Sequence, residues 1–82
     1  MYTVYILYSQ NLDRYYTGYT SGSLESRLKK HLSSHKGFTG KSPDWVIRYF
    51  EKYEDKRDAM KRERQIKNWK SRDMILKLIN RT

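Results

Sequence analysis

An arginine and a histidine lie one helical turn apart in a segment whose leucines recur every fourth residue. The leucines are Leu24, Leu28 and Leu32, and their spacing predicts a helix with one buried face. Arg27 and His31 lie beside that face, which places a cation and a titratable imidazole together where the helix meets the sheet. This pair could act on an anion. Half-buried basic residues also often pair with a carboxylate or bind a carbonyl group, so a structural role stays open.

One carboxylate stands alone in a strongly basic stretch. Glu63 is the only acidic residue between positions 61 and 72. It lies four residues after Ala59 and three before Ile66, so it shares their predicted inward face. Two interpretations are open. Glu63 could form an ion pair with a neighbouring arginine, or it could bind Mg²⁺, which accepts one or two carboxylates and takes its other ligands from water and substrate phosphates.

The composition points to a polyanionic partner. The 82 residues carry a formal net charge of +9, which favours nucleic acid over an acidic membrane surface or a basic surface kept for solubility. The absence of cysteine excludes disulfides and thiolate metal sites. A mean hydropathy of -1.04, no long apolar run and no apolar signal region near the start predict a cytoplasmic protein without a membrane partner. The length predicts one domain over residues 1–82.

The elements that must position these residues can be predicted from periodicity and capping residues. A short connection between the first two strands predicts an antiparallel hairpin. Glycines and a proline predict a basic loop before the third strand. The predicted elements are strands at 2–9, 15–20 and 45–53, a helix after Ser23, a helix from Asp55 to about Asn68, and a short helix after Ser71. The expected fold is α/β (α+β), a three-stranded, mainly antiparallel sheet flanked by helices in the order β-β-α-β-α-α.

The order and spacing of these residues resemble the GIY-YIG nuclease superfamily. Its two name-giving signatures match Val4-Tyr5-Ile6 and Tyr16-Thr17-Gly18. Its helix arginine, followed one turn later by a histidine in many members, matches Arg27 and His31, and its metal-binding glutamate matches Glu63. The resemblance covers nearly the whole chain. It extends to the small single-domain branch, which resembles the N-terminal nuclease domain of excinuclease C.

This resemblance implies metal-dependent hydrolysis of phosphodiester bonds in DNA, in repair or in processing of branched DNA. Tyr16 or His31, or both through a water, would be the general base. Arg27 would stabilise charge on the pentacovalent phosphate, and Glu63 would hold one Mg²⁺ or Mn²⁺ ion. The hydroxyl of Tyr5 would orient water or phosphate.

Two further predictions concern binding. The resemblance also implies that Gly18 lets the backbone approach closely. Several basic residues should contact phosphates of a nucleic acid, DNA rather than RNA: Lys36, Lys41, Lys61, Arg64, Lys67, Lys70 and Arg72. The alternative function is a nucleic-acid-binding module that has kept this fold but lost useful catalysis.

Overall fold

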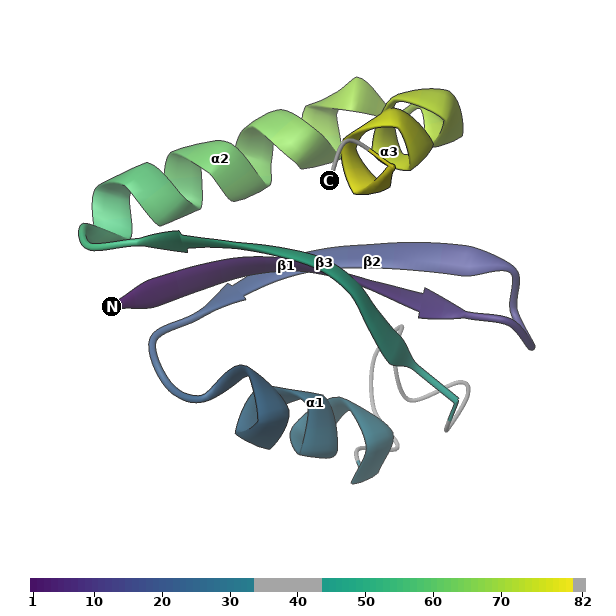
Figure 1. The fold of residues 1–82 in the computed structure, drawn as a ribbon, viewed down its shortest axis with the longest axis horizontal. Coiled ribbons are helices and arrows are strands. Elements are labelled where there is room, and N and C mark those ends of the chain that lie inside the picture. The colour runs from purple at the N-terminus through teal and green to yellow at the C-terminus, as the bar shows by residue number, and fades with distance from the viewer. Residues whose placement is uncertain (34–43, 81–82) are drawn as a thin grey trace.

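A three-stranded antiparallel sheet lies between two layers of helix (Figure 1). The computed structural model describes residues 1–33 and 44–80, without the side chains of His31 and Ser33. The elements are β1 (Tyr2–Ser9), β2 (Arg14–Thr20), α1 (Leu24–Ser33), β3 (Val46–Tyr53), α2 (Lys56–Trp69) and α3 (Arg72–Ile79). The predicted order and fold class are confirmed. Residue bounds differ by one position at the starts of β2 and β3 and at the end of α2.

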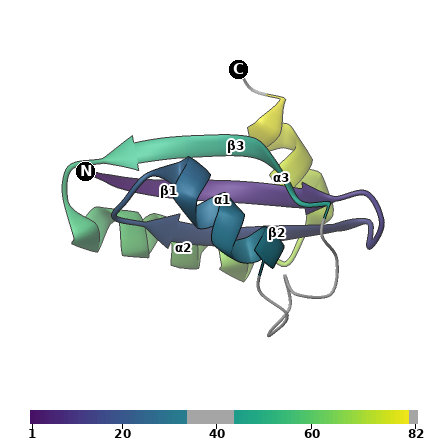
Figure 2. The ribbon, with the colours of Figure 1, turned by 90° about the horizontal axis from the view of Figure 1, so that it is seen from below.

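The central strand is β1, which pairs with β2 on one side and with β3 on the other. Side chains alternate between the two faces of a strand. Val4 and Ile6 therefore face α2 and α3, where they pack with Ala59, Ile66 and Leu78. Tyr5 and Leu7, which alternate with them along β1, pack in the opposite layer, so both faces of the sheet are covered by helix (Figures 1 and 2).

The second layer is built by the predicted leucine stripe. Leu24, Leu28 and Leu32 of α1 pack against a cluster formed by Tyr5, Leu7 and Trp45. Trp45 was predicted to begin the third strand. It instead precedes β3 and is almost fully buried under α1.

Each helix begins at a predicted cap. The Ser23 hydroxyl accepts a hydrogen bond from the Ser26 amide at 3.3 Å. The Asp55 carboxylate accepts one from the Arg57 amide at 2.9 Å, and the Ser71 hydroxyl accepts one from the Met74 amide. These bonds satisfy amides that have no partner inside a helix. Within residues 1–33 and 44–80, no helix is both long and apolar enough to cross a bilayer.

A register shift in the sheet decides what β3 presents to α2. Between Ile6 and Leu7 the partner on β3 changes from Tyr49 to Ile47, so Arg48 is an extra residue. Such a bulge changes which face the following side chains take. Ile47 therefore packs on the α1 side, whereas Tyr49 packs on the α2 side.

Candidate active site

A cleft of about 400 Å³ opens at the β2 edge of the sheet, between β2 and the helices α1 and α2. The residues that line it come from four elements and from the connection after β2. The lining is Tyr2, Tyr5, Tyr16, Gly18, Tyr19, Thr20, Ser21, Arg27, Lys56 and Glu63. Five of these were predicted as site residues from the sequence: Tyr5, Tyr16, Gly18, Arg27 and Glu63. The fold therefore brings together side chains that are up to 58 positions apart in the chain.

The strand register places Tyr5 directly opposite a glycine on the neighbouring strand. Tyr5 on β1 is the direct partner of Gly18 on β2. A Cβ atom at position 18 would lie 2.6 Å from the Tyr5 hydroxyl oxygen and 2.8 Å from the ring carbon that carries it. Only glycine leaves room for the tyrosine ring in this position. Gly18 thus leaves room for the Tyr5 side chain. The sequence did not predict this role.

Arg27 contacts the same tyrosine from α1. Its Nε atom donates a hydrogen bond to the Tyr5 hydroxyl oxygen at 3.4 Å. Burial raises the pKa of the Tyr5 hydroxyl, and the hydrogen bond from Arg27 lowers it without cancelling that effect. The charges of Arg27 and Glu63 also act on this hydroxyl, with opposite signs. Because the net shift is upward, Tyr5 is protonated at neutral pH and serves as a hydrogen-bonding group.

Glu63 lies on the cleft wall formed by α2. Its side chain is 19% exposed, and it forms an ion pair with Lys67 one turn later, with Oε2 and Nζ 3.6 Å apart. The interpretation that Glu63 pairs with a neighbouring arginine is therefore wrong. Among the residues that the structure describes, no ion pair joins Glu63 to Arg27. These two opposite charges line the same cleft without neutralising each other.

Tyr16 contacts two buried aromatic residues of the α1 layer, Tyr5 and Trp45. Its ring centroid is 6.5 Å from that of Tyr5 and 6.4 Å from that of Trp45, the latter in an edge-to-face arrangement. The Lys67 ammonium lies 5.8 Å from the centroid of the Tyr16 ring. Lys67 therefore contacts both Tyr16 and Glu63, and it holds a positive charge at one end of the cleft.

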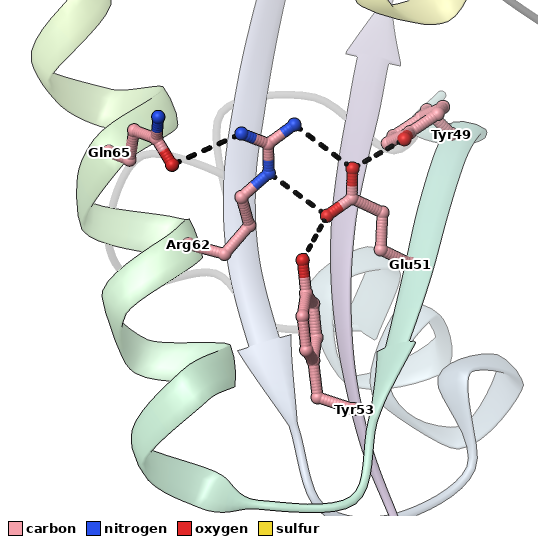
Figure 3. Close-up of polar contacts among 5 residues, drawn as sticks. All are labelled: Tyr49, Glu51, Tyr53, Arg62 and Gln65. Atoms are coloured by element: carbon pink, nitrogen blue, oxygen red, sulfur yellow. Dashed lines mark hydrogen bonds and ion pairs between the residues drawn. The ribbon is translucent and has the colours of Figure 1, made fainter.

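The neighbouring arginine on α2 has another partner (Figure 3). Arg62 donates two hydrogen bonds to the carboxylate of Glu51 on β3, at 3.0 and 3.1 Å, and a third to Gln65. Tyr49 and Tyr53 donate their hydroxyls to the same carboxylate at 2.5 and 2.6 Å. These hydrogen bonds join α2 to β3. The alternation of Tyr49, Glu51 and Tyr53 was visible in the sequence, but their partner was not.

The predicted phosphate-binding residues fall into three groups. A second hollow lies beside the cleft, between the start of β2, the end of α2 and the start of α3. Lys61 and Arg64 lie on α2 and line neither the cleft nor this second hollow. Lys67, Lys70 and Arg72 line that neighbouring hollow, and the Arg72 guanidinium pairs with the Asp13 carboxylate. The last group, Lys36 and Lys41, lies outside the described residues, as does the side chain of His31.

Sequence reasoning missed one cation of the cleft. Lys56 is the first residue of α2 and lines the cleft with Arg27. Its position directly after the cap Asp55 was a signal that it begins a helix. Nothing in its sequence neighbourhood indicated that the start of this helix lies against the end of β2.

Comparison with known proteins agrees with this geometry. The GIY-YIG catalytic domain family matches residues 1–77, which is nearly all of the chain. The chain belongs to the GIY-YIG family, whose members are nucleases, and nucleic acid is the substrate class that this membership implies. Comparisons with curated proteins and with solved structures gave no significant match. The closer resemblance to the excinuclease C domain stays a prediction.

Proposed function

We propose that this chain is a single-domain, divalent-metal-dependent endonuclease that hydrolyses phosphodiester bonds in DNA. The observation that carries the proposal is the placement of Arg27 and Glu63 in one cleft without an ion pair between them. Opposite charges kept apart in a wet cleft are available to a substrate anion and to a cation. A cytoplasmic location and action on branched DNA in repair belong to the same proposal and rest on the sequence resemblance.

Arg27 and Lys56 are the positive groups that would receive the scissile phosphate. The guanidinium of Arg27 can donate hydrogen bonds to the oxygens on which negative charge grows when phosphorus becomes pentacovalent. Tyr5 orients this guanidinium through the hydrogen bond to Nε. The protonated hydroxyl of Tyr5 is suited to positioning and not to accepting a proton.

The attacking water must lose a proton as its oxygen bonds to phosphorus. Tyr16 or His31 would accept that proton, and the two stay open as alternatives. One phosphorus–oxygen ester bond breaks on the opposite side, and the leaving oxygen takes a proton from solvent. The products are a phosphomonoester and a hydroxyl group.

Glu63 suits a hard cation that needs few protein ligands. The described residues contain no group of three or more His, Cys, Asp or Glu side chains that could form a complete metal site. Mg²⁺ and Mn²⁺ bind through one or two carboxylates together with waters and substrate phosphates, so a single half-buried carboxylate fits them. When bound, the ion would neutralise charge on the phosphate and on the leaving oxygen.

The contact between Glu63 and Lys67 favours a second candidate function. If Lys67 keeps Glu63 neutralised when nucleic acid binds, no metal is recruited and the protein is a binding module. Lys67 is 49% exposed and the pair is long at 3.6 Å, which makes it a weak competitor for Mg²⁺. We therefore place hydrolysis first.

The test is a nicking assay on supercoiled plasmid, branched DNA and RNA with Mg²⁺ or Mn²⁺. The wild-type protein is expected to cleave DNA and to stop when EDTA is added. Glu63→Gln, purified in the same way, measures any contaminating nuclease and should be inactive. Undiminished cleavage in EDTA would refute the metal role, and binding without any cleavage would establish the binding module.

A further inference from the structure

A second hollow, of about 390 Å³, lies beside the active-site cleft and shares Tyr16 with it. One wall is the beginning of β2. The other is formed by the last turn of α2 and the start of α3. The two hollows therefore follow one another along the β2 edge of the sheet, and a chain-like ligand in the cleft would continue into this one.

The rim of the second hollow is cationic. Arg14 lies on the β2 side, and Lys67 and Lys70 lie on the α2 side. Lys67 occupies the boundary, because it also contacts Glu63 and the ring of Tyr16 in the cleft. A phosphodiester chain that runs from the cleft into the hollow would pass these charges in succession.

Lys70 occupies a backbone position that normally takes another residue. It ends α2 in the left-handed region, at φ 49° and ψ 31°. Glycine and asparagine are the residues usually found in that conformation at a helix end. A lysine that accepts this strain and lines a hollow is a candidate for a functional residue.

The floor of the hollow is apolar and aromatic. Ile66 is buried, and Ile75 and Tyr15 are half-buried residues that pack beside it. A site for a free inorganic anion would need polar groups at its base. A cationic rim above an apolar floor instead matches a nucleotide, whose phosphate is charged and whose base has an apolar face.

We propose that this hollow binds the nucleotide next to the cleaved phosphodiester, with its phosphate against Lys67 and Lys70 and its unstacked base against the half-buried side chains of Ile75 and Tyr15. The inference rests on the proposed nuclease function and deepens it. Since a paired base must first leave its stack, DNA with an unpaired nucleotide beside the scissile bond is the favoured substrate.

One acidic residue limits how strongly the hollow attracts DNA. The Asp13 carboxylate pairs with the guanidinium of Arg72, which lies 5.5 Å from the Tyr15 ring centroid. Hydrogen bonds from Arg72 and Tyr8 lower the pKa of Asp13 to about 2, so it stays ionised near neutral pH. Arg72 is therefore engaged with Asp13, and removal of that carboxylate should release a further cation for phosphate.

The experiment compares three fluorescent DNA hairpins in EDTA, where cleavage is not expected. One is fully paired, one carries a single unpaired nucleotide, and one carries an abasic site at that position. The wild-type protein is expected to bind the unpaired nucleotide about tenfold or more tightly than the paired hairpin, and the abasic hairpin should lose most of this gain. Equal affinity for all three would overturn the inference.

Three variants locate the binding site. Lys70→Asn keeps a residue that tolerates the left-handed conformation, so its melting temperature should equal or exceed that of the wild type. Its affinity should fall, and its salt slope should decrease by about 0.9 log unit per log unit of salt, the value expected when one duplex phosphate is no longer neutralised. Asp13→Asn should raise the affinity and increase the salt slope, because it releases Arg72 for a phosphate. The matched control Lys52→Gln, on β3 at the other edge of the sheet, should leave the preference for the unpaired nucleotide intact.

Equal effects of Lys70→Asn and Lys52→Gln would also overturn the inference. Cleavage assays on the same hairpins in Mg²⁺ distinguish failure of the nucleotide-site inference from failure of the proposed nuclease function. Cleavage of paired and unpaired hairpins at equal rates would leave the nuclease and remove the nucleotide site. A Lys70-dependent preference in binding, without cleavage of any hairpin, would support the nucleotide site and remove the nuclease.

Discussion

Arg27 on α1 and Tyr5 on β1 are joined by a hydrogen bond of 3.4 Å from Nε to the hydroxyl oxygen. The ring of Tyr5 can lie there because its strand partner is Gly18. The position of the cleft's guanidinium therefore depends on a tyrosine, and the position of that tyrosine depends on a glycine. This dependence can be tested at each residue.

Tyr5→Phe should reduce cleavage more than stability. The ring keeps its packing, but the Nε atom of Arg27 loses the acceptor that orients it, and misplacement of a catalytic group costs about tenfold or more in rate. The melting temperature should change less than the rate, since the hydrogen bond from Arg27 is long. Tyr49→Phe is the matched control, because it removes a hydroxyl bound to Glu51 outside the cleft. It should lower the melting temperature and spare the nicking rate.

Gly18→Ala should damage both stability and cleavage. The new methyl group would lie 2.6 Å from the Tyr5 hydroxyl oxygen, so the buried ring must shift, at a cost of about 1–3 kcal/mol in the free energy of unfolding. The shift also separates Tyr5 from Arg27. Gly22→Ala is the control, because a Cβ atom there meets nothing within 4 Å. Urea unfolding and nicking rates measure the two effects, and equal behaviour of both variants would contradict the close approach.

Arg27→Ala and Glu63→Gln should abolish cleavage while leaving the melting temperature nearly unchanged. Breaking a buried ion pair costs about 3–5 kcal/mol, but these residues are not paired with each other. The interaction that Glu63→Gln does weaken, with exposed Lys67, is worth only about 0.3–0.5 kcal/mol. Thermal melts and nicking assays should use the same preparations. A large loss of melting temperature in both variants, with cleavage falling only as protein unfolds, would assign both residues a structural role.

The Glu51 carboxylate should make stability depend on acidic pH. Burial raises its pKa, but the hydrogen bonds from Arg62, Tyr49 and Tyr53 outweigh burial and lower the pKa below its usual 4.5. A lowered folded pKa contributes stability above about pH 4.5, and this contribution is lost as pH falls through the folded value. Glu51→Gln should cost about 1–3 kcal/mol at pH 7 because Arg62 loses its charged partner. The difference from wild type should shrink below pH 4.5, and a constant difference would contradict the pKa shift.

The basic residues of α2 should not contribute equally to DNA binding. Lys67 and Lys70 line the second hollow, whereas Lys61 and Arg64 line neither that hollow nor the cleft. Charge removal at Lys67 and Lys70 should lower the salt slope by about 0.9 for each phosphate that is no longer neutralised. The same change at Lys61 and Arg64 should leave the slope closer to that of the wild type. Equal slopes for the two double variants would place the DNA elsewhere on the protein.

Local patterns along the chain were enough to predict the elements and their order. Caps at Ser23, Asp55 and Ser71 and the leucine period of α1 act between residues within a few positions of each other, so they can be interpreted without a fold. Arg27 was singled out by its place beside the leucine period and Glu63 by its isolation among basic residues, whereas Tyr5, Tyr16 and Gly18 were singled out by their resemblance to the GIY-YIG signatures. Their presence in one cleft follows from a topology that was also predictable.

The partners of the charged residues depend on the tertiary structure and could not be predicted. Arg62 binds Glu51 across 11 positions, and Arg72 binds Asp13 across 59. A pattern of charges along a chain does not say which of several arginines reaches a given carboxylate, because that depends on strand register, the bulge in β3 and the crossing of α2 over the sheet. For the same reason the prediction that treated Arg72 only as a phosphate-binding residue missed Asp13. The position of Lys70 in the lining of the second hollow likewise depends on tertiary structure, because it is set by where the end of α2 lies relative to β2.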